Sequence, residues 1–379
     1  MGWTRRVPFL ATAATTIAVV IGLAAPAHAA YTEEPISLPW HPAGAVHSSV
    51  SGNGVVYLGG KLNGTGGIAA IDAASGNLLW LIPANNDVRA LALSEDGSRL
   101  FAGGSFSAVD GATHRHLAAI NVANHSVVPT GKGGWKGRAA GQVRDLLVRG
   151  STLYVAGKIT SVDGVAQRGM GAVDVTTGLR VASFTFSADN DVLGLALTGS
   201  RLLISGTFSH VNGATRNSLA AIDLSTNTLT GWAPARLCST CTQYWDVQTD
   251  GTNAYVATSG NRSGAFNLVT GSQPWPAITG DGDFQAVWLP GDGRVYLGGH
   301  FGQSIWAQGQ TVSASNVAAV FISTGRIDPD WTPKIYKVYP GTWTFASTPG
   351  KLWFGGDFTG ERQNGANNHK PYLAAYPAL

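Results

Sequence analysis

The side chains that could carry chemistry gather around one repeated feature of the sequence. The segments DGDFQ and GGHF contribute Asp281, Asp283, Gln285 and His300. A carboxylate and an imidazole can work as an acid–base pair when they lie within about 3 Å of each other. A group of carboxylates and amides can instead bind a cation, a sugar or a peptide amine. Whether these residues form an acid–base pair or a binding site depends on the strands and turns that position them.

Polar residues recur at equivalent points along the chain. One position stands directly before each of seven alternating apolar runs and holds Ala45, Asp87, Gln142, Asp191, Gln243, Asp283 and Gly341. A second position follows short glycine-containing motifs and brings Lys61, Lys158, His300 and Asp357. An Asp at such a point can bind a ligand, or it can cap a turn by accepting backbone N–H bonds.

Together these positions predict a ring of ligand-binding groups. Trp245 and Trp343 lie near the same points, where an indole could stack on a sugar face or be buried for stability. The predicted ligand-binding residues are Asp87, Gln142, Asp191, Gln243, Asp283, Gln285, His300, Trp343 and Asp357. The sequence contains no G-x-S-x-G, no H-E-x-x-H and no complete EF-hand loop, so it identifies no catalytic set, metal-ligand set or cofactor.

A repeat of about 50 residues places these positions. Four copies read VYLGGKL, LFAGGSF, VYLGGHF and LWFGGDF, and three degenerate copies read VAGKI, ISGTF and VATSG. The second residue of each glycine pair, or its equivalent, is Gly60, Gly104, Gly157, Gly206, Thr258, Gly299 and Gly356. Each repeat holds four alternating runs rich in Val, Ile, Leu and aromatic residues and bounded by Gly, Asp and Asn, which is typical of β-strands.

These repeats predict an all-β, seven-bladed β-propeller of four-stranded blades. A four-stranded unit cannot bury both faces of its sheet alone, so copies stack radially. The last repeat ends at its third run, YLAAYPAL, and the missing type of run, ISLPWHP, stands at 36–42. We therefore expect the N-terminal strand to complete the last blade and close the ring. The glycine pairs are expected to give room for backbone, and the tryptophans beside prolines to pack between blades.

The first 29 residues have the pattern of a signal peptide. Arg5 and Arg6 precede an apolar stretch of about a dozen residues, and AHA at 27–29 predicts cleavage after Ala29. The arginine pair leaves the twin-arginine export route open beside the general one. The prediction is a single domain over 30–379 that is secreted and extracellular, possibly bound to the cell wall, with no later apolar segment long enough for membrane insertion.

Charge and cysteine content exclude some partners. Removing the leader leaves 23 basic and 22 acidic side chains, which argues against nucleic acid as a partner. We also expect the protein to be a monomer. The only cysteines, Cys238 and Cys241, stand in CSTC without a second C-x-x-C. A local disulfide is therefore predicted rather than a zinc site or a reactive dithiol.

The segments VYLGGHF, LWFGGDF, FSHVNGATRNSLAAID and CSTC resemble the secreted actinobacterial β-propellers built from delta-60 repeats. The resemblance covers about residues 35 to 379. It implies a secreted propeller and supplies no catalytic residues. The fifth repeat departs from the pattern, since VATSGNR lacks the glycine pair and most of the loop that follows it.

Three functions follow from this sequence. The first is a recognition protein that binds an extracellular glycan or cell-envelope component at the channel mouth. The second is a polysaccharide hydrolase or lyase that uses carboxylate and histidine groups at the same mouth. The third is a protein-interaction scaffold that uses the outer surface. The sequence leaves open whether the protein is an enzyme, because fold alone does not determine activity.

Overall fold

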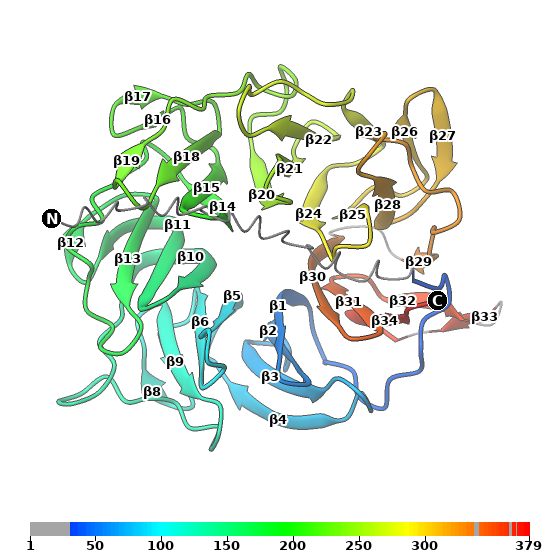
Figure 1. Ribbon diagram of the computed structural model, residues 1–379. Coiled ribbons are helices and arrows are strands. Elements are labelled where there is room, and N and C mark those ends of the chain that lie inside the picture. Colours follow the sequence, from blue (N-terminus) through cyan, green and yellow to red (C-terminus); the bar gives the residue numbers. More distant parts are fainter. Residues whose placement is uncertain (1–30, 337–340, 364–365, 369) are drawn as a thin grey trace, which may run out of the picture.

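The computed structural model describes residues 31–336, 341–363, 366–368 and 370–379, which form seven main β-sheets around a central axis (Figure 1). The described residues contain 34 strands and no helix. The predicted all-β, seven-bladed propeller is confirmed. The predicted signal peptide, residues 1–29, lies outside the described residues.

Each blade is an antiparallel sheet whose first strand faces the central channel. The first strands are β1 (Val46–Gly52), β5 (Val88–Leu93), β10 (Ala139–Arg149), β14 (Val192–Thr198), β20 (Tyr244–Thr249), β24 (Phe284–Trp288) and β30 (Thr342–Thr348). The second strands are β2 (Val55–Gly60), β6 (Arg99–Gly104), β11 (Thr152–Val162), β15 (Arg201–Gly206), β21 (Asn253–Thr258), β25 (Arg294–Gly299) and β31 (Lys351–Gly356). The third strands are β3 (Gly67–Asp72), β9 (Leu117–Asn121), β13 (Met170–Asp174), β18 (Leu219–Asp223), β22 (Arg262–Asn267), β28 (Val317–Phe321) and β34 (Leu373–Pro377).

The outermost position of each blade is the least regular. A strand occupies it in three blades, namely β4 (Leu78–Pro83), β19 (Thr228–Leu229) and β23 (Ile278–Gly280). In the second, third and sixth blades only one bridge to the third strand is formed, by Val127, Arg180 and Ile327 respectively. The remaining short strands lie in the loops after the second strands: β7 (Ala108–Val109), β8 (Ala112–Thr113), β12 (Val165–Ala166), β16 (His210–Val211), β17 (Ala214–Thr215), β26 (Ser304–Ala307), β27 (Gln310–Ser313), β32 (Gly360–Gln363) and β33 (Ala366–Asn368), with β29 (Ile335–Tyr336) pairing β32.

The N-terminal segment completes the seventh blade, as predicted. Tyr31 forms a bridge with Ala378, and the N–H groups of Thr32 and Ile36 donate to carbonyls of β34. Figure 1 shows this blue segment beside the red C-terminal strands. These bonds lie mostly upstream of the predicted run 36–42. That run contains two prolines, which have no N–H to donate to a strand ladder.

The hydrophobic core is divided among the blade interfaces. Seven buried clusters are present among the described residues, and each combines side chains of two adjacent blades. Between the first and second blades, for example, Tyr57 and Ile68 pack with Val88 and Phe106. A blade therefore needs both neighbours to bury its two faces, which explains why the ring must close.

The glycine pairs fit two close approaches, and their predicted structural role is confirmed. A Cβ on Gly103 would lie 2.4 Å from a methyl group of Val143 in the next blade. A Cβ on Gly104 would lie 2.2 Å from the carbonyl oxygen of Asp87 in its own blade. The first glycine of the pair thus admits the neighbouring blade, and the second admits the start of the first strand.

We expect Gly104→Ala to lower the free energy of unfolding by about 2–3 kcal/mol, because backbone must move to admit the methyl group. Chemical denaturation measures this change. The control is Gly231→Ala, where a Cβ would meet nothing within 4 Å. Equal stabilities of the two variants would contradict the steric role.

Tryptophans at the rim join adjacent blades, also as predicted. Trp232 donates its indole N–H to the carbonyl of Asn267 in the next blade, and Trp275 donates to Ile322 in the same way. Trp331 repeats the contact by donating to Thr32 at 3.0 Å, so the N-terminal segment is held by the sixth blade as well as the seventh. All three indoles are at least 94% buried.

Candidate functional site

A β-bulge occurs near the start of every first strand and creates the lining of the channel. The pairing register of each first strand shifts across one residue that the ladder omits. These seven residues are His47, Arg89, Arg144, Leu193, Trp245, Gln285 and Trp343, and all of them line a central cavity of about 500 Å³. A bulge re-aims a side chain, and here it re-aims one side chain per blade into the channel. We call these seven residues the bulge ring.

Charged groups from three blades meet at one side of the bulge ring. The imidazole Nδ1 of His47 lies 2.7 Å from Oδ1 of Asp87, and Nη2 of Arg89 lies 2.7 Å from the other oxygen of Asp87. Nε2 of His47 lies 3.6 Å from Oδ2 of Asp357. That oxygen also accepts the indole N–H of Trp343 at 2.6 Å. His47 is therefore held between carboxylates of the second and seventh blades.

These contacts shift the pKa values of the three groups in compatible directions. Burial alone would lower the pKa of His47, but hydrogen bonds with Asp357 and Asp87 raise it above its usual value. Burial alone would raise the pKa of Asp87 and of Asp357, but the hydrogen bonds and charge of His47 lower both. The site therefore favours a protonated imidazole between two ionised carboxylates.

An aromatic row continues from this cluster around the channel. The ring of Trp343 lies edge-to-face with His47, with centroids 6.0 Å apart. Trp343 also lies edge-to-face with Trp245, again at 6.0 Å and with an interplanar angle of 81°. Both indoles are only partly buried. A flat apolar surface therefore stands next to charged groups in one cavity.

Two half-buried carboxyl groups that line the cavity lie one residue beyond the bulges. Asp145 accepts the N–H of Leu146 and, across the blade boundary, the N–H of Leu195, both at 2.7 Å. Asp246 likewise accepts the N–H of Val247 at 2.7 Å and that of Val287 in the next blade at 2.9 Å. Each side chain thus connects two neighbouring first strands.

Burial raises the pKa of both groups despite these bonds. The pKa of Asp145 rises to about 8, because of burial and the charge of Asp246. The pKa of Asp246 rises to about 7 through burial. Within the described residues, no three His, Cys, Asp or Glu side chains are grouped so that they could hold a metal ion.

Two of the nine predicted ligand-binding residues, Gln285 and Trp343, line the cavity, and two more, Asp87 and Asp357, contact residues of the bulge ring. Of the other five, Asp191, Gln243 and Asp283 directly precede first strands, Gln142 lies on β10, and His300 follows β25. Gln142 donates to Ser105 Oγ at 2.5 Å, and Asp191 lies 3.6 Å from Nζ of Lys158. Gln243 is partly buried and is not among the residues that line the cavity.

The contact between Asp283 and His300 joins a backbone N–H to the imidazole and is not that of an acid–base pair. His300 Nε2 accepts the backbone N–H of Asp283 at 3.2 Å. The carboxylate of Asp283 accepts the N–H of Asn261 in the fifth blade at 3.0 Å. In this position Asp283 acts as a turn cap, which is the structural alternative that the sequence left open.

The sequence missed four members of the bulge ring, namely His47, Arg89, Arg144 and Leu193. Each stands two residues after the position that was expected to line the channel. For the three polar residues the available signal was their place directly after the first valine of the run, as in VRAL at 88–91. In a regular strand that residue and its neighbours alternate between two faces, so only the bulge shows that it enters the channel.

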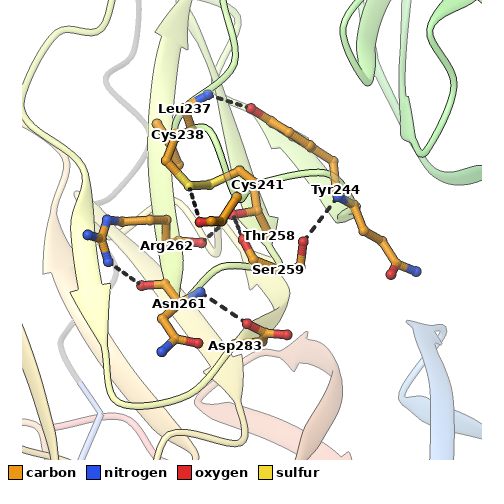
Figure 2. Close-up of a disulfide and its surroundings, with 11 residues drawn as sticks. Leu237, Cys238, Cys241, Tyr244, Thr258, Ser259, Asn261, Arg262 and Asp283 are labelled. Carbon is orange, nitrogen blue, oxygen red and sulfur yellow. Dashed lines mark hydrogen bonds between the residues drawn. A yellow bond between two sulfur atoms is a disulfide. The ribbon is translucent and has the colours of Figure 1, made fainter.

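The fifth blade keeps its shape without the glycine pair. Thr258 replaces the second glycine, and its hydroxyl bonds the carbonyl of Arg262 at 2.7 Å across a short turn. The predicted disulfide between Cys238 and Cys241 is present, with Cα atoms 5.1 Å apart. Figure 2 shows it above this turn, next to Tyr244. The disulfide fixes the segment that leads into β20.

Comparisons with known proteins identify the fold alone. No protein-family model matches the chain, and no curated protein sequence matches it. Among solved structures, the WD40 β-propeller domain of Doa1 is similar with a TM-score of 0.61 and 9% identity, over 92% of this chain and 97% of that one. The computationally designed Ika8 protein is similar with a TM-score of 0.51 and 12% identity, over 91% and 99%. The class of protein is therefore a seven-bladed β-propeller.

In the part of the chain that the structure describes, no helix is long and apolar enough to cross a membrane.

Proposed function

We propose that the protein is a secreted recognition protein that binds an extracellular glycan or cell-envelope component at the mouth of the central channel. The observation that carries this proposal is the pair of partly exposed indoles, Trp245 and Trp343, in a cavity that also holds charged and amide groups. A sugar has apolar C–H faces and hydroxyl edges. An indole surface beside hydrogen-bonding groups suits both.

Location is part of the same proposal. The leader-like sequence at 1–29 and the resemblance to delta-60 propellers support export. The disulfide between Cys238 and Cys241 supports an oxidising compartment. Glycans of the cell envelope and of the surroundings are the ligands that such a protein meets.

We expect Trp245→Ala to weaken glycan binding at least tenfold, about 1.4 kcal/mol, because the variant removes a stacking surface. Binding is measured by calorimetry on the envelope or plant glycan that raises the melting temperature of the wild type most. The matched control is Trp306→Ala, an exposed tryptophan on β26 that does not line the cavity. If both variants bind like the wild type, the channel is not the site and an outer-surface scaffold is the better proposal.

The position of His47 favours a second candidate function, a polysaccharide hydrolase or lyase. A histidine held between Asp87 and Asp357 has the components of a proton-transfer group. For this candidate, His47→Ala must abolish product formation from a polysaccharide while the fold, followed by circular dichroism, is kept. A wild type that binds the glycan without releasing product excludes it.

A further inference from the structure

One cation of the channel, Arg144, has no direct partner within the described residues, although Asp87 and Asp191 attract it without contact. Arg89 is paired with Asp87, and Lys158 with Asp191. The guanidinium of Arg144, on the first strand of the blade that also carries Lys158, has no hydrogen bond and no ion pair within the described residues, and its Nε is buried. Burying an unpaired charge is costly, so a protein keeps one mainly where a ligand completes it.

The charges around Arg144 also favour binding of an anion. Burial and the nearby charge of Arg89 together lower the pKa of its guanidinium to about 10, although the charges of Asp87 and Asp191 oppose this shift. The group therefore stays positive at neutral pH, but its charge is poorly stabilised by the protein. An anion in the cavity would relieve both the lost hydration and the repulsion from Arg89.

Two other channel groups have an unused hydrogen-bonding atom. The indole Nε1 of Trp245 and Oε1 of Gln285 are buried and have no hydrogen-bond partner within the described residues. The cavity wall thus offers two donors, on Arg144 and Trp245, and one amide. A carboxylate accepts from donors, and a hydroxyl pairs with either end of an amide.

We infer that the channel ligand is a sugar acid whose carboxylate is bound by Arg144, with its ring against Trp245 and a hydroxyl on the amide of Gln285. This inference rests on the proposed glycan-binding function and specifies its ligand. A carboxylate suits the site better than a phosphate group, because one guanidinium is unpaired while Asp87, Asp191 and Asp357 would repel a second negative charge.

A matched pair of ligands tests the charge alone. Oligogalacturonate and its methyl ester share the same rings and differ in the negative charge of the carboxyl group. We expect calorimetry to show at least tenfold tighter binding of the acid by the wild type, and this preference to shrink with added salt. Inorganic phosphate is the third probe and is expected to compete weakly.

Variants of Arg144 assign the preference to one residue. Arg144→Gln is expected to weaken binding of the acid at least thirtyfold, to change binding of the ester less than threefold, and to leave the melting temperature equal or higher. Arg144→Lys keeps the charge without the planar fork and should retain part of the preference. Arg138→Gln is the control, since this surface arginine pairs with Asp163 outside the central cavity.

The possible results distinguish a failure of the sugar-acid inference from a failure of the proposed glycan-binding function. Equal binding of acid and ester by the wild type, or an equal loss of both in Arg144→Gln, overturns the sugar-acid inference and leaves glycan recognition standing. If the wild type binds only neutral glycans, the sugar-acid inference is likewise overturned and glycan recognition is kept. If no glycan of any charge binds the wild type, both proposals fail. If phosphate displaces the acid at equal concentration, the site binds anions in general and the assignment to a sugar acid is wrong.

Discussion

A chain that lacks residues 31–36 should lose about 4–6 kcal/mol of unfolding free energy. The segment contributes backbone hydrogen bonds to β34 and accepts the indole N–H of Trp331, and each such bond contributes about 1 kcal/mol. It also buries Tyr31, which packs edge-to-face on Tyr296 at 5.6 Å. Burial of an aromatic side chain contributes about 2 kcal/mol more.

Urea denaturation of the shortened and full chains measures this loss. A variant in which Gly and Ser replace residues 31–36 controls for chain length, and we expect it to be nearly as unstable as the deletion. Unfolding midpoints within about 0.3 M of the full chain for both variants would show that ring closure does not depend on this segment.

The sequence predicted the architecture because every blade repeats the same alternating runs. Four clear copies of one pattern, at a spacing of about 50 residues, identified the three degenerate copies, such as the fifth, where Thr258 replaces glycine. The closure was also predictable, since a run was missing at one end and present at the other. Its exact pairing was not, because Trp40 and its prolines marked the run, whereas Thr32 and Ile36 supply the hydrogen bonds.

The candidate site was only half predictable for a local geometric reason. An alternating run assigns each residue to one of two faces, and a bulge changes that assignment at a single point. Asp87 and Asp357 were found because polar residues stand out at turns. His47 and Arg144 were not, because nothing in the run states where the register shifts.

Asp145→Ala should destabilise the protein by about 2–4 kcal/mol at pH 6, one of the two largest effects we expect. The carboxyl accepts N–H groups from the third and fourth blades, and its removal leaves two buried donors without an acceptor. Asp246→Ala should destabilise the protein by a similar amount, because Asp246 accepts N–H groups from the fifth and sixth blades. Thermal unfolding of each variant against Asp110→Asn, an exposed carboxyl in a loop, measures the difference.

The same two groups should make stability fall as pH rises. Unfolded aspartates lose their protons near pH 4, whereas burial raises the folded pKa of Asp145 to about 8 and that of Asp246 to about 7. Between those pH values the folded state holds protons that the unfolded state has released, so each step up in pH favours unfolding until the folded groups ionise.

The double variant Asp145→Asn/Asp246→Asn removes both titratable carboxyl groups. We expect the wild type to lose stability steadily from pH 5 to pH 8, and the double variant to show a much smaller slope although it starts from a lower stability. Asp110→Asn should keep the slope of the wild type. Parallel curves for the wild type and the double variant would mean that both carboxyls are ionised in the folded protein. Their backbone N–H partners would then outweigh their burial.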